Sequence, residues 1–446
     1  MSSKRILIAV ILILSVKVAA QQKLTHQQAV KIALEKNVML NQQENNLYSS
    51  QVQRNQSIAA FLPGVNVRGT AQRTSGLQQS RDGGDLIDVT VEEMFANVNA
   101  ELVLFNGMNR LNALQQNNSQ FKAQISFVER TKQDVIYNVT TQYLQVLLDQ
   151  ELFRIADENY KTQNTVLEQL REQVNVGARA EASLYTQEAL VLNLKVTALR
   201  AKVALENDEA TLKQTLQLDP SDIYKIDFPE TSSLPVINSE SMDSLYLNAL
   251  NNRQDLKRIN HQVSANQHQY QGALSGYIPT LSLFASYGSY YTSQLKDEPL
   301  YGNFANQFGT AWPSLQYGIS VTVPIFDRFL TRNNRTLNRV RYENSQLEKE
   351  NLEKSIKIDV QRAYNNFKAA IQAYEASLIQ IKAGELALST QKESFLLGVS
   401  DQVSLSLANQ TYVQAAASKA QAEVTLLFQK ILLDYALGTL KAEDIP

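Results

Sequence analysis

One uninterrupted segment constrains the fold of this chain more than any other part of the sequence. Between Arg328 and Leu397 there is no proline and only one glycine, Gly384. Apolar residues recur there at intervals of three and four positions, from Val360 to Ile381, which predicts one long amphipathic helix. At ~1.5 Å per residue that helix is about 100 Å long. A compact soluble domain does not need a rod of this length.

The helical pattern resumes after Gly398 and runs to Leu437. Glycine at the end of a helix supplies the left-handed residue that a tight turn needs. Residues 328–437 are therefore predicted to form a long helical hairpin. Taken alone, the same segment would fit a coiled-coil stalk equally well.

The features of this segment occur twice in the chain. Landmarks in the second half stand 221 positions after their counterparts in the first half, and nearer the N-terminus the separation is 216. The matching pairs are Phe105 and Phe326, Tyr143 and Tyr364, and Gly177 and Gly398 at the first separation, with Ala33 and Ala249, and Pro63 and Pro279, at the second. This regularity indicates a tandem duplication, with five residues added between the proline and the phenylalanine of the second copy.

The duplication divides the chain into two repeats behind a leader. Residues 1–20 have the charged start, apolar core and small-residue cleavage site of a secretory signal peptide. The expected segments are a first repeat at 21–218 (a helix, a β-hairpin at 65–104 and a helical hairpin at 107–217), a connector at 219–240, a second repeat at 241–440 (a helix, a β-hairpin at 280–325 and a helical hairpin at 328–437) and a polar tail at 441–446. Thr25, followed three residues later by Gln28, predicts a capping box at the start of the first helix.

The β-hairpin segments alternate between apolar and polar residues, with a polar loop expected at about 76–91. In the second copy we expect one face to contact lipid and the other to contact water. The residues assigned to lipid are Leu281, Leu283, Tyr317, Ile319 and Val321, and those assigned to water are Gln316, Ser320 and Thr322. Four strands are too few to close a barrel, whereas three chains related by cyclic symmetry would supply twelve.

Composition excludes several classes of function. The chain of 446 residues has no cysteine, three histidines and a net charge of −2. A disulfide framework and a thiolate metal site are therefore excluded, and no basic surface for nucleic acid is expected. No nucleophile elbow, phosphate loop or metal-ligand spacing is present. We therefore expect no enzyme, no catalytic residue, no metal site and no cofactor.

Several short motifs, taken in order, resemble the TolC-type outer membrane efflux protein family. They are Leu24-Thr25 with Ala29 and Ala33-Leu34-Glu35-Lys36-Asn37, Pro63 and Pro279 before the strands, Val323-Pro324-Ile325-Phe326-Asp327 before the long helix, the turns at Val176-Gly177 and Gly398, and Ala436-Leu437-Gly438-Thr439-Leu440. The resemblance covers nearly the whole mature chain, and it is specific through motif order and duplication rather than through one motif.

The resemblance implies an α+β membrane protein. Its tandem-duplicated, long antiparallel helical hairpins would form a trimeric α-barrel in the periplasm, continuous with a trimer-shared, 12-stranded transmembrane β-barrel in the outer membrane. The implied partners are two further copies of the chain, a periplasmic adaptor protein, an inner-membrane pump and outer membrane lipid. The implied function is an exit duct of a tripartite efflux system, passing small molecules such as drugs.

The resemblance also assigns the hairpin turns. The adaptor is expected to dock at Val176, Gly177 and Ala178 in the first turn and at Leu397, Gly398 and Val399 in the second. Some relatives carry an acidic ring after the second turn, but this chain has Ser404 and Leu407 there. The candidate gate residues are instead Arg179, Glu181, Ser183, Asp401 and Ser404, with Arg179 expected to reach Asp401 or Glu181 of a neighbouring hairpin.

Two other functions remain open on the sequence alone. A duct for type I protein secretion would have the same architecture, and a non-transport periplasmic coiled-coil protein would explain the long helices but not the alternating strands.

Overall fold

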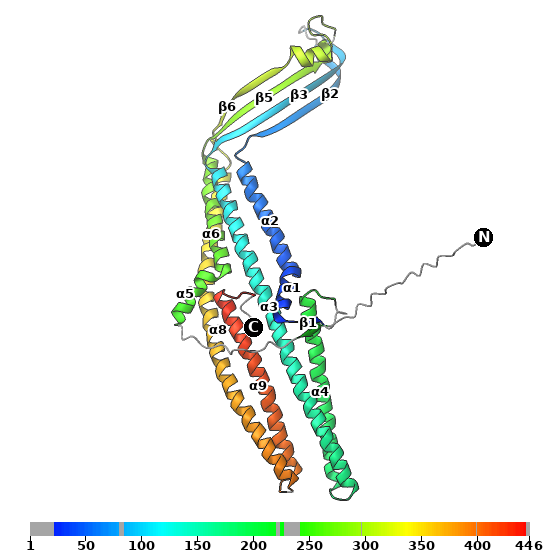
Figure 1. Cartoon of the computed structure of the whole chain (residues 1–446). Coiled ribbons are helices and arrows are strands. Elements are labelled where there is room, and N and C mark those ends of the chain that lie inside the picture. The colour runs from blue at the N-terminus through cyan, green and yellow to red at the C-terminus, as the bar shows by residue number, and fades with distance from the viewer. Residues whose placement is uncertain are drawn as a thin grey trace, which may run out of the picture. The chain divides into compact units, whose positions relative to one another are not determined.

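The computed structural model describes residues 22–79, 84–219, 224–226, 241–295, 297–397 and 399–442. The chain forms two compact units, which are described separately (Figure 1). Unit 1 takes residues 1–42, 129–254 and 354–446, and unit 2 takes residues 43–128 and 255–353. The expected signal peptide, most of the connector and Gly398 lie outside the described residues.

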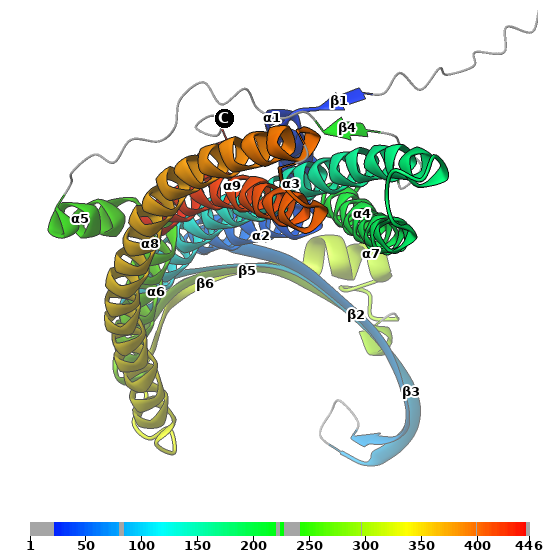
Figure 2. The same cartoon turned by 90° about the horizontal axis from the view of Figure 1, so that it is seen from below.

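Unit 2 contains a four-stranded antiparallel sheet. Its strands lie in the order β2 (Gly64–Gln79), β3 (Leu86–Asn106), β5 (Thr280–Thr292) and β6 (Ser314–Thr322). The β3–β5 pair joins the two repeats, and Figure 2 shows the sheet as strongly curved. Strands β2 and β6 are its edges, and neither has a second strand partner among the described residues.

The first hairpin is longer than its sequence predicted. The expected polar loop at 76–91 is wrong, because β2 continues to Gln79 and β3 already begins at Leu86. Polar cross-strand pairs extend the ladder after the apolar alternation has ended. The hydroxyl oxygens of Ser75 and Thr90 are 2.9 Å apart, and the Gln72 amide donates to Glu93 at 2.5 Å.

Each helical hairpin begins two residues later than predicted, at Asn109 rather than 107 and at Leu330 rather than 328. The reason is a left-handed pair of residues between strand and helix. Gly107 and Met108 have φ of 61° and 64°, and Arg328 and Phe329 have 57° and 65°. The preceding side chain then caps the helix: Asn106 accepts from the Arg110 amide at 3.3 Å, and Asp327 from the Thr331 amide at 2.8 Å.

The long helices are α3 (Asn109–Asn175), α4 (Glu181–Thr215), α8 (Leu330–Leu396) and α9 (Gln402–Leu437). Helices α3 and α8 have 67 residues each and stand 221 positions apart. The shorter helices keep the separation of 216: α1 (His26–Lys36) matches α5 (Met242–Asn252), and α2 (Val38–Ala59) matches α6 (Gln254–Gly272). These bounds confirm the duplication.

The five added residues lie between β5 and β6, where the second copy has short helical turns and the first copy has none among its described residues. These are η2 (Ser293–Leu295), α7 (Phe304–Asn306) and η3 (Gln307–Ala311), while η1 (Ala273–Tyr277) precedes β5.

The part of α8 that belongs to unit 1 packs through a regular row of buried side chains, here called the seam. Its buried residues recur at intervals of three and four positions, and from Val360 onward large and small side chains alternate: Ile356, Val360, Ala363, Phe367, Ala370, Tyr374 and Ser377. The period of 3.5 is that of a coiled coil. Gly384 continues the close approach, because a Cβ there would lie 3.3 Å from the Cα of Tyr412 in α9.

The N-terminal segment is fastened to α3 in unit 1. Strand β1 (Gln22–Leu24) pairs in parallel with β4 (Tyr224–Ile226), and Tyr143 of α3 donates to the Leu24 carbonyl at 3.1 Å. Thr25 and Gln28 form the predicted capping box. Among the helices that the structure describes, none is long and apolar enough to cross a membrane.

Candidate functional site

The first hairpin turn exposes an apolar side chain next to a glycine in the left-handed conformation. Val176 is 77 % exposed, and Gly177 has φ of 75° with open space where a Cβ would stand. The Gly177 amide donates to the Val174 carbonyl at 2.9 Å, and the Ala178 amide to the Gln173 carbonyl at 2.8 Å. These bonds end α3 in the manner of a Schellman turn. Gly177 is therefore required by its conformation and not by packing within the chain.

The second turn is also apolar and exposed. Leu397 is 79 % exposed and Val399 is 82 % exposed. The Val399 amide donates to the Ser394 carbonyl at 2.9 Å. Gly398 itself lies outside the described residues. The two turns thus present large apolar side chains, which is typical of a protein-binding surface when they gather.

Asp401 caps α9 and does not pair with Arg179 within the chain. Its carboxylate accepts from the Ser404 amide at 2.7 Å, and this hydrogen bond holds the pKa of Asp401 below its usual value. The Arg179 guanidinium lies 5.1 Å from the ring centre of Phe395. In the described part of the chain, no ion pair joins Arg179 to Asp401 or Glu181, so the expected pairing stays a prediction for contacts between protomers.

Beside the turns, α4 and α9 enclose a groove of about 420 Å³. Ser183 and Leu190 line it from α4, and Val403, Ser406 and Leu407 line it from α9. Leu407 is 63 % exposed and Val403 is 75 % exposed. The groove therefore combines hydroxyl groups with accessible apolar side chains.

Buried amides connect the two helical hairpins behind this groove, which the sequence did not predict. Gln187 of α4 is 2 % exposed and donates to the backbone and side-chain oxygens of Gln163 in α3, both at 3.0 Å. Gln402 of α9 donates to the Gln187 side-chain oxygen at 2.8 Å. Two helical turns further along α9 from Gln402, Asn409 donates to Asn159 of α3 at 2.9 Å. Two separate groups of amide hydrogen bonds thus link both hairpins near the turns, and the one around Gln187 is buried.

The five residues assigned to lipid share one face of the sheet. Leu281 is paired with Val321, Leu283 with Ile319, and Ala285 with Tyr317. Their side chains are accessible in the isolated chain, with Tyr317 at 77 % and Ile319 at 63 %. The opposite face is polar across three strands, because Ser286 donates to Asn99 at 2.8 Å and Asn99 donates to Asn66 at 3.3 Å.

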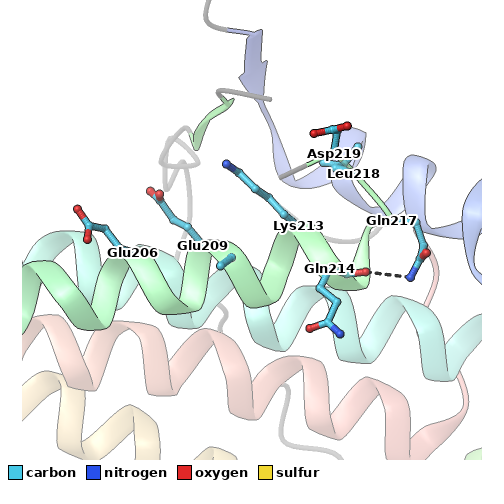
Figure 3. Close-up of a pocket in the computed structure, with 8 residues that line it drawn as sticks. Glu206, Glu209, Lys213, Gln214, Gln217, Leu218 and Asp219 are labelled. Carbon is cyan, nitrogen blue, oxygen red and sulfur yellow. Dashed lines mark hydrogen bonds between the residues drawn. The ribbon is translucent and has the colours of Figure 1, made fainter. Parts of the chain in front are cut away.

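A recess at the C-terminal end of α4 has mixed charge. Glu206, Glu209 and Lys213 project from one side of the helix, and Gln217 donates to the Gln214 carbonyl at 3.1 Å (Figure 3). Burial raises the pKa of Glu209, and Lys213 opposes the shift. Among the described residues, no cluster of three or more His, Asp or Glu side chains could hold a metal ion.

Solved structures define the class of protein to which this fold belongs. A membrane protein from Pseudomonas aeruginosa superposes with a TM-score of 0.80 at 16 % identity, covering 94 % of this chain and 91 % of that one. The CmeC outer membrane channel of Campylobacter jejuni superposes with a TM-score of 0.79 at 18 % identity, covering 93 % and 85 %. The fold is that of outer membrane channels.

Sequence comparison then identifies the family. The outer membrane efflux protein family matches residues 29–216 and 245–439. The chain is also 22 % identical over 399 residues to the outer membrane protein TolC of Vibrio cholerae, covering 87 % of this chain and 85 % of that protein. This chain belongs to the outer membrane efflux protein family and is a protein of the outer membrane.

Proposed function

We propose that three copies of this chain form the exit duct of a tripartite efflux system for small molecules. The observation that carries the proposal is the four-stranded sheet, which has one apolar face, one polar face and two open edges. Open strand edges are not stable in lipid, where backbone groups must be paired. Pairing β6 of one protomer with β2 of the next satisfies both edges and closes a ring of twelve strands around a polar lumen.

The helical turns suit docking of a periplasmic adaptor, which would connect the duct to an inner-membrane pump. The proposed docking residues are those predicted from the sequence: Val176, Gly177, Ala178, Leu397, Gly398 and Val399. The exposure of Val176, Leu397 and Val399 supports this role, because nothing else in the chain covers them among the described residues. The groove between α4 and α9 lies beside the turns and offers a partner helix both hydroxyl and apolar contacts.

The same end of the duct is proposed to hold its gate. The gate residues are Arg179, Glu181, Ser183, Asp401 and Ser404, and the amide network around Gln187 joins the hairpins that opening would separate. Arg179→Glu is expected to raise the conductance of the resting pore, and adding Asp401→Arg is expected to lower it again. Equal conductance of wild type and Arg179→Glu at low salt, where ion pairs are strongest, would exclude the ion-pair gate.

Conductance across planar bilayers tests the duct, and capture of its partners tests the system that it serves. A photo-reactive residue at Val399 should capture a periplasmic adaptor, and the adaptor should in turn retain an inner-membrane drug pump. Recovery of a protein-secretion exporter would instead assign the duct to type I secretion. Absence of any pore from the purified protein would contradict the proposal altogether.

A further inference from the structure

Where β5 ends, the polar face of the sheet carries a group of aromatic rings. Phe95 and Tyr290 are register partners with ring centres 4.6 Å apart. Trp312 lies edge-on to Tyr290 at 6.5 Å and stacks on Tyr301 at 5.5 Å. Phe95 is 43 % exposed and Trp312 is 37 % exposed. These rings are accessible on a face that elsewhere carries mainly polar side chains, together with Phe284 and Arg68.

A carboxylate lies next to the rings and is held by neutral groups. Glu93 accepts from the Tyr290 hydroxyl at 3.1 Å and from the Gln72 amide at 2.5 Å. In the part of the chain that the structure describes, no lysine or arginine forms an ion pair with Glu93. The adjacent Glu92 differs, because it faces the other side of the sheet and lies 3.9 Å from the Arg73 guanidinium. Glu93 is therefore held in place by hydrogen bonds, and no ion pair to a cationic side chain occupies it among the described residues.

The loop that carries Trp312 is fixed on β5. Gln307 is fully buried and makes three hydrogen bonds: it accepts from the Thr292 amide at 3.1 Å and donates to the carbonyls of Thr292 and Gly302 at 3.2 and 3.1 Å. Ser289 donates to the Phe308 carbonyl at 2.6 Å. A satisfied buried network of this kind holds a loop in one conformation, so Trp312 stands at a defined place relative to Tyr290 and Glu93.

Building on the proposed duct, in which the polar face lines the lumen, we propose that Glu93, Phe95, Tyr290 and Trp312 form a transit site for organic cations with aromatic or other apolar groups. Aromatic faces attract cations, and the carboxylate supplies a matching charge. Threefold symmetry would place three such sites around the exit. Exposed cation–π contacts are weak, which suits a conduit, because a site on a permeation path must release what it binds.

The test is block of single pores in planar bilayers by tetraphenylphosphonium, a bulky aromatic cation, with its anionic counterpart tetraphenylborate as the reference. We expect tetraphenylphosphonium to block wild-type pores and tetraphenylborate to block them far less. Glu93→Gln and Trp312→Ala should each raise the half-blocking concentration about threefold to tenfold. Glu92→Gln is the matched control, since it removes a neighbouring charge from the other face, and it should leave block unchanged.

Two further measurements separate the outcomes. Trp312→Phe keeps an aromatic face and should retain most of the block, so a loss in this variant equal to that in Trp312→Ala would contradict the site. If the Glu93→Gln and Glu92→Gln variants both form conducting pores and tetraphenylphosphonium blocks them equally, the transit site is wrong, whereas the proposed duct still stands. Absence of conductance in the wild type would defeat the proposed duct and the transit site together.

Discussion

His26 lies in the packed N-terminal part of unit 1, where burial lowers its pKa to about 4. Its Nε2 is 2.8 Å from the Thr140 hydroxyl, and its ring lies edge-on to Tyr143. The unfolded chain takes up a proton near pH 6.5, whereas the folded chain resists it. The contribution of neutral His26 to the free energy of unfolding is therefore fully present above about pH 6.5. It is lost as the pH drops toward 4, which lowers the stability by up to about 3 kcal/mol.

His26→Gln should remove this acid sensitivity, because glutamine can still bond to Thr140 but does not titrate. Thermal unfolding followed by circular dichroism between about pH 7 and pH 5 measures the effect. Parallel pH profiles for wild type and variant would show that His26 does not contribute.

Asp149 of α3 has the opposite dependence. It is 7 % exposed, accepts from the Gln145 amide at 3.2 Å, and has an Oδ2 atom with no hydrogen-bond donor among the described residues. Burial, reinforced by Asp208 of α4, raises the pKa of Asp149 to about 6. The folded chain thus holds a proton that the unfolded chain releases near pH 4. Its contribution to stability is complete below about pH 4 and is lost as the pH rises toward 6.

Asp149→Asn should therefore raise the stability at neutral pH by roughly 1–3 kcal/mol and have little effect near pH 4. Glu188 on α4 is exposed, and Glu188→Gln serves as the control. It should change the stability neither at neutral pH nor near pH 4. A destabilised Asp149→Asn protein at neutral pH would mean that the ionised carboxylate is needed.

Among the secondary-structure elements, the sheet gives the most direct prediction: its apolar face contacts lipid and its polar face contacts water. Ile319 is on the apolar face and Thr322, three residues later, is on the polar face. An arginine near the middle of a membrane strand costs about 2–4 kcal/mol on the lipid side, so Ile319→Arg should reduce the yield of heat-resistant, membrane-inserted protein. Thr322→Arg should insert almost normally. Similar insertion of both variants would contradict the assigned faces.

The helical turns carry a second prediction for an element. Gly177→Trp should abolish efflux while leaving insertion and oligomeric mass unchanged, because the substitution strains a left-handed residue and adds bulk where a partner docks. Gly84→Trp is a control for bulk alone, since Gly84 lies outside the strands and also has open space but no positive φ. Normal efflux by Gly177→Trp, with the adaptor still bound, would mean that docking occurs elsewhere.

Sequence patterns predicted the helices more accurately than they predicted which helical residues pack together. The large apolar residues of α8 revealed the helix, and Val360, Phe367 and Tyr374 are buried as expected. The small members of the same seam, Ala363, Ala370 and Ser377, gave no hydrophobic signal. Leu378, a large apolar residue within the predicted stripe of 360–381, is 40 % exposed instead. Helix approach is decided by small residues as much as by large ones, and periodicity alone does not find them.

For the whole molecule, the duplication could be predicted because the same landmarks recur at a fixed separation in the sequence. The long helices α3 and α8 have that same separation of 221 residues. The buried amide network was not readable, because glutamines at 163, 187 and 402 are far apart in sequence and are usually solvated. The left-handed pair at Arg328 and Phe329 was also missed, since neither residue type signals that conformation. The polar and strained features that bear on function thus depend on tertiary structure.

In the duct that we propose, each chain supplies one third of a closed sheet, with β6 of one protomer paired to β2 of the next. The chain has no cysteine, so paired substitutions can be tested without a background. Ile319→Cys on the apolar face of β6 would be combined in turn with Val65→Cys, Val67→Cys and Ala71→Cys on the same face of β2. Oxidation in the membrane should link one of these combinations into a covalent ring of three chains, with each single variant remaining monomeric on denaturing gels. Monomers from every combination, or an open ladder that continues beyond three chains, would contradict a barrel shared by a trimer.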